Sequence, residues 1–429
     1  MFKFLFDIEN RKFMRLWWAQ FISQFGDRIN QMALIGLIAE RTPGSTLGLA
    51  KLLSFTIIPV FVVGPLAGAF VDRWDSRRTL FVCDILRGLL VLTIPFIFIQ
   101  RESMIPIYAV VFLIFCFSRF YVPAKMSIIP DLVTKENLLL ANSLITTTGM
   151  LAFVLGCSLG GFLVDALGAK GGFIADAVTF LFSGLLIISI PSGFRIGGIP
   201  RRIVSTGKEM LRIEKSVIAE VKEGLAYIMN HKEIRFVINM LFILLTAAGA
   251  VYVVIIVFIQ QAFDTITKDL GLLAVFLGLG LFSGALLYGR WGKKFAWHKT
   301  IFFCLACGGV MMGVFASVVN RYPNLIFAGA LAAGLGLVIG PIFIATNTIV
   351  HIVSDEKMRG KVFGAIEVVI HFAFLISMLT SSLLSEYVAR VWILVGVSVI
   401  FLLVGCLGLL RYRKSVPLHA EAGGEENTG

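Results

Sequence analysis

Charged side chains are scarce in this sequence, and their scarcity decides the class of protein. Asp, Glu, Lys and Arg make up 15% of the 429 residues, whereas 58% are hydrophobic and the mean hydropathy is +0.91. A soluble domain of this length cannot cover so much apolar surface. The composition therefore excludes a soluble protein and predicts an all-α membrane protein that crosses the bilayer many times.

The sequence also lacks the motifs that indicate an enzyme. It contains no H-E-x-x-H metal motif, no Walker loop, and no nucleophile motif with a partnered base. Its six cysteines are scattered through apolar segments, and Cys304-x-x-Cys307 has neither charges nor histidines beside it. We therefore expect no enzyme activity, no cofactor and no metal site. The sequence also has no nucleotide site, so if a membrane protein of this kind moved a solute uphill, an ion gradient or an exchanged solute would have to drive it.

Twelve apolar segments of spanning length are separated by charged or turn residues. They lie near 14–39, 46–71, 79–99, 104–127, 142–165, 172–191, 235–260, 269–289, 299–320, 323–347, 361–384 and 388–411. The longest connection carries apolar residues at helical spacing and charges on its other face, which predicts an amphipathic helix on the membrane surface. The predicted parts are a six-helix bundle (1–195), a cytoplasmic linker (196–234), a second six-helix bundle (235–412) and a disordered tail (413–429).

Acidic residues are outnumbered, with 26 Asp and Glu against 38 Lys and Arg and a net charge of +12. Most of the basic residues fall in the termini and in every second connection, which places both termini in the cytoplasm. This distribution accounts for the charge without a nucleic-acid partner. We expect a multi-pass protein of the bacterial inner membrane, surrounded by lipid and monomeric.

The two halves of the chain carry corresponding landmarks. Gly64-x-x-x-Gly68 precedes the first charged loop, and Gly280-x-x-x-Gly284 occupies the matching place in the second half. Pro123 and Pro341 correspond at nearly the same offset. Small residues four apart allow close approach of membrane helices. Repeated halves predict two pseudo-symmetric bundles with a substrate site near the midplane between them.

The first predicted span holds the most informative polar pattern. Gln20, Gln24, Asp27 and Gln31 are spaced so that all four lie on one helical face. A polar stripe with a carboxylate at mid-depth is costly against lipid, so we expect it to face water or substrate. Asp27 is then a proton-coupling or substrate-binding group. The alternative is a structural acid paired with a buried arginine.

Two arginines are candidates for the same cavity. Arg28 projects away from the stripe toward a neighbouring helix, and Arg119 in the fourth span could pair with an acid or an anionic substrate, or snorkel to the inner surface.

Asp165 and Asp176 fall near the outer ends of spans five and six, where we expect caps and loop contacts.

A dense charge cluster follows the second span. We interpret it, together with two charges of the third span, as a cytoplasmic gate network of Gly68, Asp72, Arg73, Asp75, Arg77, Arg78, Asp84 and Arg87. Asp72 is expected to dock on the N-terminal dipole of another helix. Glu367 in the eleventh span is expected to form a structural clasp at the place where Asp72 docks.

The spacing Gly68-x-x-x-Asp72-Arg73-x-Asp75-x-Arg77-Arg78 resembles the loop 2–3 signature of the major facilitator superfamily. Asp75 in place of the usual second glycine is similar to the macrolide-efflux and siderophore-exporter branch. Further similar stretches are Pro123-Ala124, Ile129 to Val133, Ala141 to Leu144, Glu220 to Ile228, and Arg359 to Gly364.

This resemblance implies a proton-coupled exporter of an amphipathic compound such as a drug, a macrolide or a siderophore, working by alternating access. Spans 1, 4, 7 and 10 would line its cavity. Two observations keep alternatives open. Span five carries Gly156-Cys157 where the exporter signature has Gly-Pro, and Tyr121-Val-Pro123-Ala124-Lys125 resembles bacterial lysophospholipid transporters. The alternatives are a lysophospholipid flippase and, in another class, a non-transporting receptor or scaffold.

Overall fold

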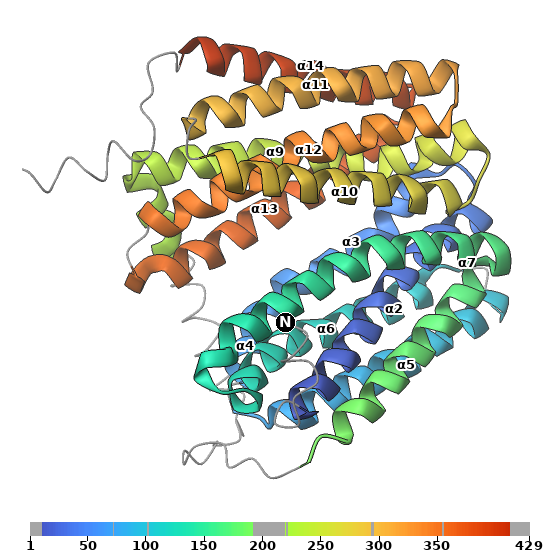
Figure 1. Ribbon diagram of the computed structural model, residues 1–429. Helices are drawn as coiled ribbons and strands as arrows, with labels where there is room; N and C mark the ends of the chain where they lie inside the picture. Colours follow the sequence, from blue (N-terminus) through green and yellow to red (C-terminus); the bar gives the residue numbers. More distant parts are fainter. Residues whose placement is uncertain are drawn as a thin grey trace, which may run out of the picture. The chain divides into compact units, whose positions relative to one another are not determined.

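Helices make up the regular structure of this protein. The computed structural model describes residues 11–71, 73–100, 103–191, 219, 222–292, 296–353 and 356–411, and this part contains helices and no strands (Figure 1). The elements are α2 (Arg11–Arg41), α3 (Thr46–Val62), α4 (Gly64–Val71), α5 (Ser76–Gln100), α6 (Ile105–Leu132), the short 3₁₀ helix η2 (Lys135–Asn137), α7 (Leu138–Ile188), α9 (Lys232–Phe263), α10 (Lys268–Trp291), α11 (Trp297–Arg321), α12 (Leu325–Val353), α13 (Glu356–Leu384) and α14 (Arg390–Arg411). This confirms the predicted all-α membrane fold.

Nine helices of the described part are long and apolar enough to cross a membrane, and the difference from twelve predicted spans has physical causes. The first span, α2, is not among the nine because its polar side chains lower its hydropathy. The second span is divided into α3 and α4. Spans five and six form one long helix, α7, with a turn inside it.

The division of the second span follows from its prolines. Pro59 lies inside α3, and a second proline at 65 lacks the backbone N–H that would continue the helix. Val63 connects the two helices, and its N–H donates to the Pro59 carbonyl at 2.9 Å. The result is a break within one span, close to the predicted charged loop.

The turn inside α7 depends on Gly168. Its φ of 71° and ψ of 175° suit a residue without a side chain. The next residue, Ala169, donates its N–H to Glu40 Oε1 at 2.8 Å. A carboxylate at a helix start compensates the unpaired N–H groups there. The end of α2 thus caps the second half of α7, and the predicted turn between spans five and six is confirmed.

The chain forms two compact units, built mainly from α2 to α7 and from α9 to α14. We refer to them as the N-terminal and C-terminal bundles and describe each by itself. Residues 222–230 are helical, but the predicted linker lies largely, and the predicted tail wholly, outside the described residues. The four-part division with its boundaries stays a prediction.

Glycines let α2 pack closely on both halves of α7 in the N-terminal bundle. A Cβ atom added at Gly156 would come within 2.7 Å of Arg28, and one at Gly160 within 3.0 Å of Ile29. On the second half of α7, a Cβ atom at Gly172 would come within 2.8 Å of Ala33. Lipid gives helices little hydrophobic reason to associate, so such close contact between small residues stabilises the bundle.

The C-terminal bundle uses the predicted Gly280-x-x-x-Gly284 step. Added Cβ atoms there would come within 1.9 Å of the Ala333 carbonyl oxygen and 2.2 Å of the Leu337 carbonyl oxygen on α12. At Gly64 and Gly68, in contrast, an added Cβ atom meets no described atom within 4 Å. The expectation that Gly64-x-x-x-Gly68 brings two helices together therefore stays a prediction.

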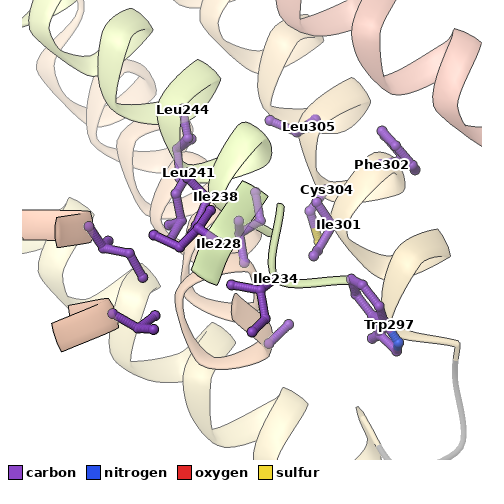
Figure 2. Close-up of a cluster of buried hydrophobic side chains, with 14 of the residues drawn as sticks. Ile228, Ile234, Ile238, Leu241, Leu244, Trp297, Ile301, Phe302, Cys304 and Leu305 are labelled. Carbon is purple, nitrogen blue, oxygen red and sulfur yellow. The ribbon is translucent and has the colours of Figure 1, made fainter. Parts of the chain in front are cut away.

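Near one end of the C-terminal bundle, buried apolar side chains of several helices meet (Figure 2). α9 contributes Ile234, Ile238 and Leu241, and α11 contributes Ile301 and Phe302, among others. Ile234 and Ile301 are fully buried. Their close packing joins α9 to α11, α12 and α13.

We expect Gly280→Ala to destabilise the C-terminal bundle by about 1–3 kcal/mol, because its methyl group collides with the backbone of α12. Gly289→Ala is the matched control, since it lies on the same helix with no described atom within 4 Å of an added Cβ. Thermal unfolding of both variants in detergent measures the difference. Equal melting temperatures would contradict the close α10–α12 contact.

Candidate functional site

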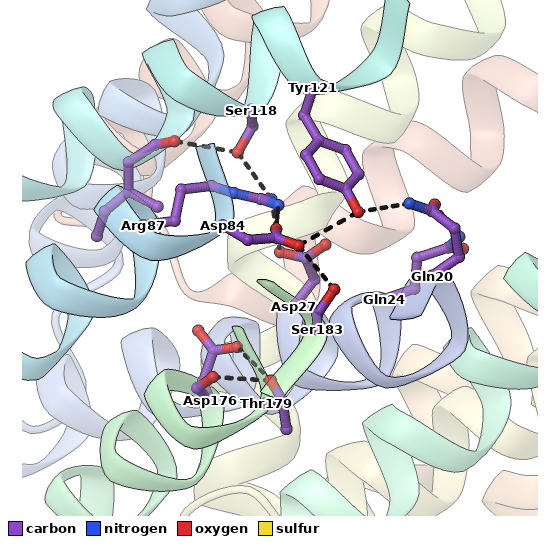
Figure 3. Close-up of polar contacts among 11 residues, drawn as sticks. Gln20, Gln24, Asp27, Asp84, Arg87, Ser118, Tyr121, Asp176, Thr179 and Ser183 are labelled. Carbon is purple, nitrogen blue, oxygen red and sulfur yellow. Dashed lines mark hydrogen bonds and ion pairs between the residues drawn. The ribbon is translucent and has the colours of Figure 1, made fainter. Parts of the chain in front are cut away.

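The polar stripe of α2 points in part into the N-terminal bundle. Gln20 is buried, with 1% of its surface exposed, and its Nε2 donates to the hydroxyl of Tyr121 on α6. Gln24 donates to Gln20 Oε1 at 3.2 Å (Figure 3). Gln31 accepts a hydrogen bond from Arg28 at 3.1 Å. The stripe is thus a set of linked polar groups that joins α2 to α6.

A buried ion pair lies beside the stripe. Asp84 and Arg87, both on α5, are 0% and 2% exposed and bind each other directly. Asp84 Oδ2 also accepts a hydrogen bond from Ser183 at 2.6 Å and lies 3.5 Å from the Tyr121 hydroxyl. The Arg87 guanidinium lies 4.3 Å from the ring centres of both Tyr121 and Phe180. Cation–π contacts and hydrogen bonds replace the water that these charges lack.

Asp27 completes this network. Its Oδ1 is 3.8 Å from Arg87 Nη1, and 40% of its side chain is exposed. One arginine therefore faces two carboxylates, one accessible to solvent and one fully enclosed (Figure 3). A proton added at Asp27, the carboxylate that solvent can reach, changes the balance of charge around a cation that is almost fully buried.

The structure gives the predicted arginines separate surroundings. Arg28 donates to Gln31 and lies 5.2 Å from the ring centre of Phe153 on α7, which fits the prediction that it faces a neighbouring helix. Arg119 is half-buried on α6. The cation that the structure places beside Asp27 is Arg87, whereas the sequence favoured Arg119 as the partner of an acid.

The predicted gate network divides into two groups. Asp84 and Arg87 join Asp27 inside the bundle, as described above. The loop residues instead complete helix ends: Asp75 Oδ1 accepts the Arg78 N–H at 2.7 Å, and Arg77 donates to the carbonyls of Ile187 and Ile188 at the end of α7. Such contacts satisfy terminal backbone groups of α5 and α7.

The remaining gate residues stay predictions. Asp72 lies outside the described residues, so its docking on another helix is untested. Arg73 and Gly68 are both half-buried, and an added Cβ atom at Gly68 meets no described atom within 4 Å. Glu367 is exposed on α13, where its carbonyl oxygen lies 2.8 Å from His371 Nδ1. A clasp between Glu367 and Asp72 remains a hypothesis.

Sequence reasoning did not assign Tyr121 and Ser183 to the network, and it did not place the pair of Asp176 and Thr179 inside the same bundle. Asp176 was expected as a cap near the outer end of span six, but it is 0% exposed. It lies against α2, because a Cβ atom added at Gly26 would come within 2.5 Å of its Oδ1. Asp176 and Ser183 are seven residues apart, and this spacing on one helical face could have indicated their shared position. No group of ligands that could hold a metal ion occurs among the described residues.

Comparison with known proteins places this chain among transporters. The family model of the Major Facilitator Superfamily matches residues 16–218 and 237–428. The chain is 28% identical over 408 residues to the uncharacterized MFS-type transporter YkuC of Bacillus subtilis, covering 92% of this chain and 91% of YkuC. It is 24% identical over 417 residues to macrolide efflux protein A of Streptococcus pyogenes (92% and 93%). It is 25% identical over 353 residues to the putative bacilysin exporter BacE of B. subtilis (80% and 81%).

Solved structures share the fold at low sequence identity. A POT family transporter in complex with 5-aminolevulinic acid aligns with a TM-score of 0.72 and 12% identity, covering 94% of this chain and 96% of that chain. A bacterial homologue of the iron transporter ferroportin in an inward-facing state gives 0.66 and 15%, covering 93% and 98%. These likenesses bear on the fold alone.

Proposed function

This chain belongs to the Major Facilitator Superfamily, and we propose that it is a proton-coupled exporter of an amphipathic small molecule that works by alternating access. Relatives named for macrolide efflux, multidrug efflux and bacilysin export support the direction of transport. The observation that carries the proposal is the sharing of buried Arg87 between half-buried Asp27, whose side chain is 40% exposed, and enclosed Asp84.

The network explains how one proton changes the site. With Asp27 ionised, Arg87 faces two carboxylates and stabilises both. With Asp27 protonated, Arg87 neutralises Asp84 alone, and the exposed face of α2 loses its negative charge. The proton therefore alters the charge that a substrate meets without leaving a buried charge unpaired.

The substrate surface begins with the glutamines of α2. Gln24 is half-buried and binds Gln20, which reaches the Asp84 pair through Tyr121. A substrate that competes for these amide groups changes the hydrogen bonds of the same network that holds the proton. Polar amides beside the aromatic rings of Trp17 and Phe21 on α2 suit a compound with both polar and apolar faces.

The protein is a multi-pass membrane protein, and we place it in the bacterial inner membrane with both termini in the cytoplasm. A monomer in contact with lipid is sufficient for this mechanism, and no nucleic acid or cofactor takes part in it. The proposal makes the chain a transporter rather than an enzyme, with two six-helix domains joined by the cytoplasmic linker.

We expect a single cysteine introduced beside Lys208 to react with an impermeant maleimide only after the cells are opened. Basic connections stay in the cytoplasm, and this one lies in the most basic part of the chain. The six native cysteines are replaced first, and a cysteine beside Arg321, expected outside, is the control. Labelling at Lys208 in intact cells would reverse the orientation.

Purified protein in vesicles with an acidic interior tests the transport itself. Inward accumulation of a radiolabelled macrolide should follow the pH gradient and stop when an ionophore collapses it. A fluorescent lysophospholipid and an iron siderophore are tested in parallel. Movement of the lysophospholipid alone would replace the exporter with the flippase, and macrolide accumulation that survives loss of the gradient would contradict proton coupling.

A further inference from the structure

Asp176 is a fully buried carboxyl group that the coupling mechanism above does not use. It lies on the second half of α7 with 0% exposure. Its Oδ1 accepts a hydrogen bond from Thr179 on the same helix at 3.4 Å, and its Oδ2 is buried with no hydrogen-bond partner among the described residues. An ionised carboxylate in such surroundings is far more costly than a neutral one.

The face of α2 that covers Asp176 is small and polar. A Cβ atom added at Gly26 would come within 1.8 Å of Thr179 Oγ1 and 2.5 Å of Asp176 Oδ1, so the two helices are in close contact at this point. Ser23 and Asn30 share the helical face of Gly26. Ser23 Oγ and Asn30 Oδ1 are also buried without partners in the described structure. Three buried polar atoms at the α2–α7 contact thus lack a partner, which a bound proton or an enclosed water molecule would supply.

The charged groups that face Asp176 come from two neighbouring helices. α2 presents Asp27, and α5 presents Asp84 and Arg87. Arg87 binds Asp84 directly and lies 3.8 Å from Asp27. Two carboxylates therefore already use this cation, and the charge on a third carboxylate would be opposed by both of them.

We propose that Asp176 is a second proton-binding group of the N-terminal bundle, one that holds its proton enclosed behind α2 while Asp27 exchanges protons with water. Gly26 leaves no gap between the helices, so α2 has to separate from α7 before water reaches the Asp176 carboxyl group. Exchange of the Asp176 proton with water therefore requires that movement. A role of this proton in transport rests on the proposed function, whereas the protonation of Asp176 is a property of the folded bundle.

Infrared spectroscopy of the purified full-length protein tests this directly. In neutral and mildly alkaline buffer, the wild type should show the C=O stretching band of a protonated carboxyl group, and Asp176→Asn should lack it. Asp75→Asn, which removes an exposed acid near the start of α5, is the matched control and should keep the band. If Asp176→Asn does not fold, Thr179→Val retains the acid and should shift the band by removing its hydrogen-bond donor.

Several results would overturn the proposal. One is a folded Asp176→Asn variant whose difference spectrum shows the loss of an ionised carboxylate. Another is a band that Thr179→Val leaves unmoved, and a third is a band that disappears when sodium replaces potassium, because a metal cation would then occupy the site. The infrared spectrum is recorded without substrate and without a pH gradient. Its result therefore tests the protonation of Asp176 even if the transport assay fails.

Discussion

Replacing Arg87 with methionine is expected to lower the free energy of unfolding by about 3–5 kcal/mol and to reduce the amount of folded protein in the membrane. The substitution keeps most of the side-chain volume between Tyr121 and Phe180 but removes the charge. Asp84, which is fully enclosed, would be left without the cation that stabilises its ionised form, whether it stays charged or takes up a proton. Breaking a buried pair by removing one partner is the costly case.

The double variant Asp84→Asn with Arg87→Met separates pairing from packing. Since it removes both charges, it should recover a large part of the stability lost by Arg87→Met alone. Arg78→Met is the matched control on the same helix, because Arg78 is exposed and its loss should change stability by no more than about 0.5 kcal/mol. Thermal unfolding in detergent measures all three. An Arg87→Met protein as stable as Arg78→Met would contradict the buried pair.

Asp27→Asn is expected to abolish accumulation driven by a pH gradient while leaving the protein folded and able to bind substrate. Arg87 keeps Asp84 as its partner, so no buried charge is stranded. The amide cannot take up a proton, and transport should become downhill exchange. Asp27→Glu keeps an ionisable group and should retain part of the activity with a shifted pH profile.

Binding, exchange and gradient-driven accumulation are measured on the same Asp27→Asn preparation. Loss of folding would favour the structural interpretation, in which Asp27 mainly compensates Arg87. Normal gradient-driven accumulation would leave Asp27 as a dispensable residue of a wet cavity. The two interpretations considered from the sequence thus give different outcomes for one variant.

The general fold could be read from the sequence because hydropathy and basic residues determine spans and their connections. The polar face of α2 was also predictable, since helical spacing alone places Gln20, Gln24 and Asp27 together. Sequence spacing could not show how far along its helix a residue lies inside the bundle, or which residues of neighbouring helices pair. Asp84 was grouped with the charged loop, but α5 begins at Ser76, so Asp84 lies about 12 Å into the helix at 1.5 Å per residue.

The same limit applies to Asp176 and to the glycine steps. Asp176 follows the Gly168 turn by two helical turns, which is enough to bring it under Gly26. Gly280-x-x-x-Gly284 and Gly64-x-x-x-Gly68 are equivalent in sequence, yet one is packed on α12 and the other meets no described neighbour. Whether a small-residue step is used depends on the partner surface, which a single helix sequence does not contain.

Proton movement caused by substrate is the most direct test of Asp27 as the coupling group. Vesicles that contain the protein and a pH-sensitive dye are loaded with macrolide and diluted into macrolide-free buffer of the same pH. The macrolide gradient is then directed outward, and no pH difference is imposed. The account predicts a change in internal pH with the wild type and none with Asp27→Asn, although both exchange labelled macrolide. Equal proton movement by the two proteins, or exchange by the wild type with no proton movement, would contradict it.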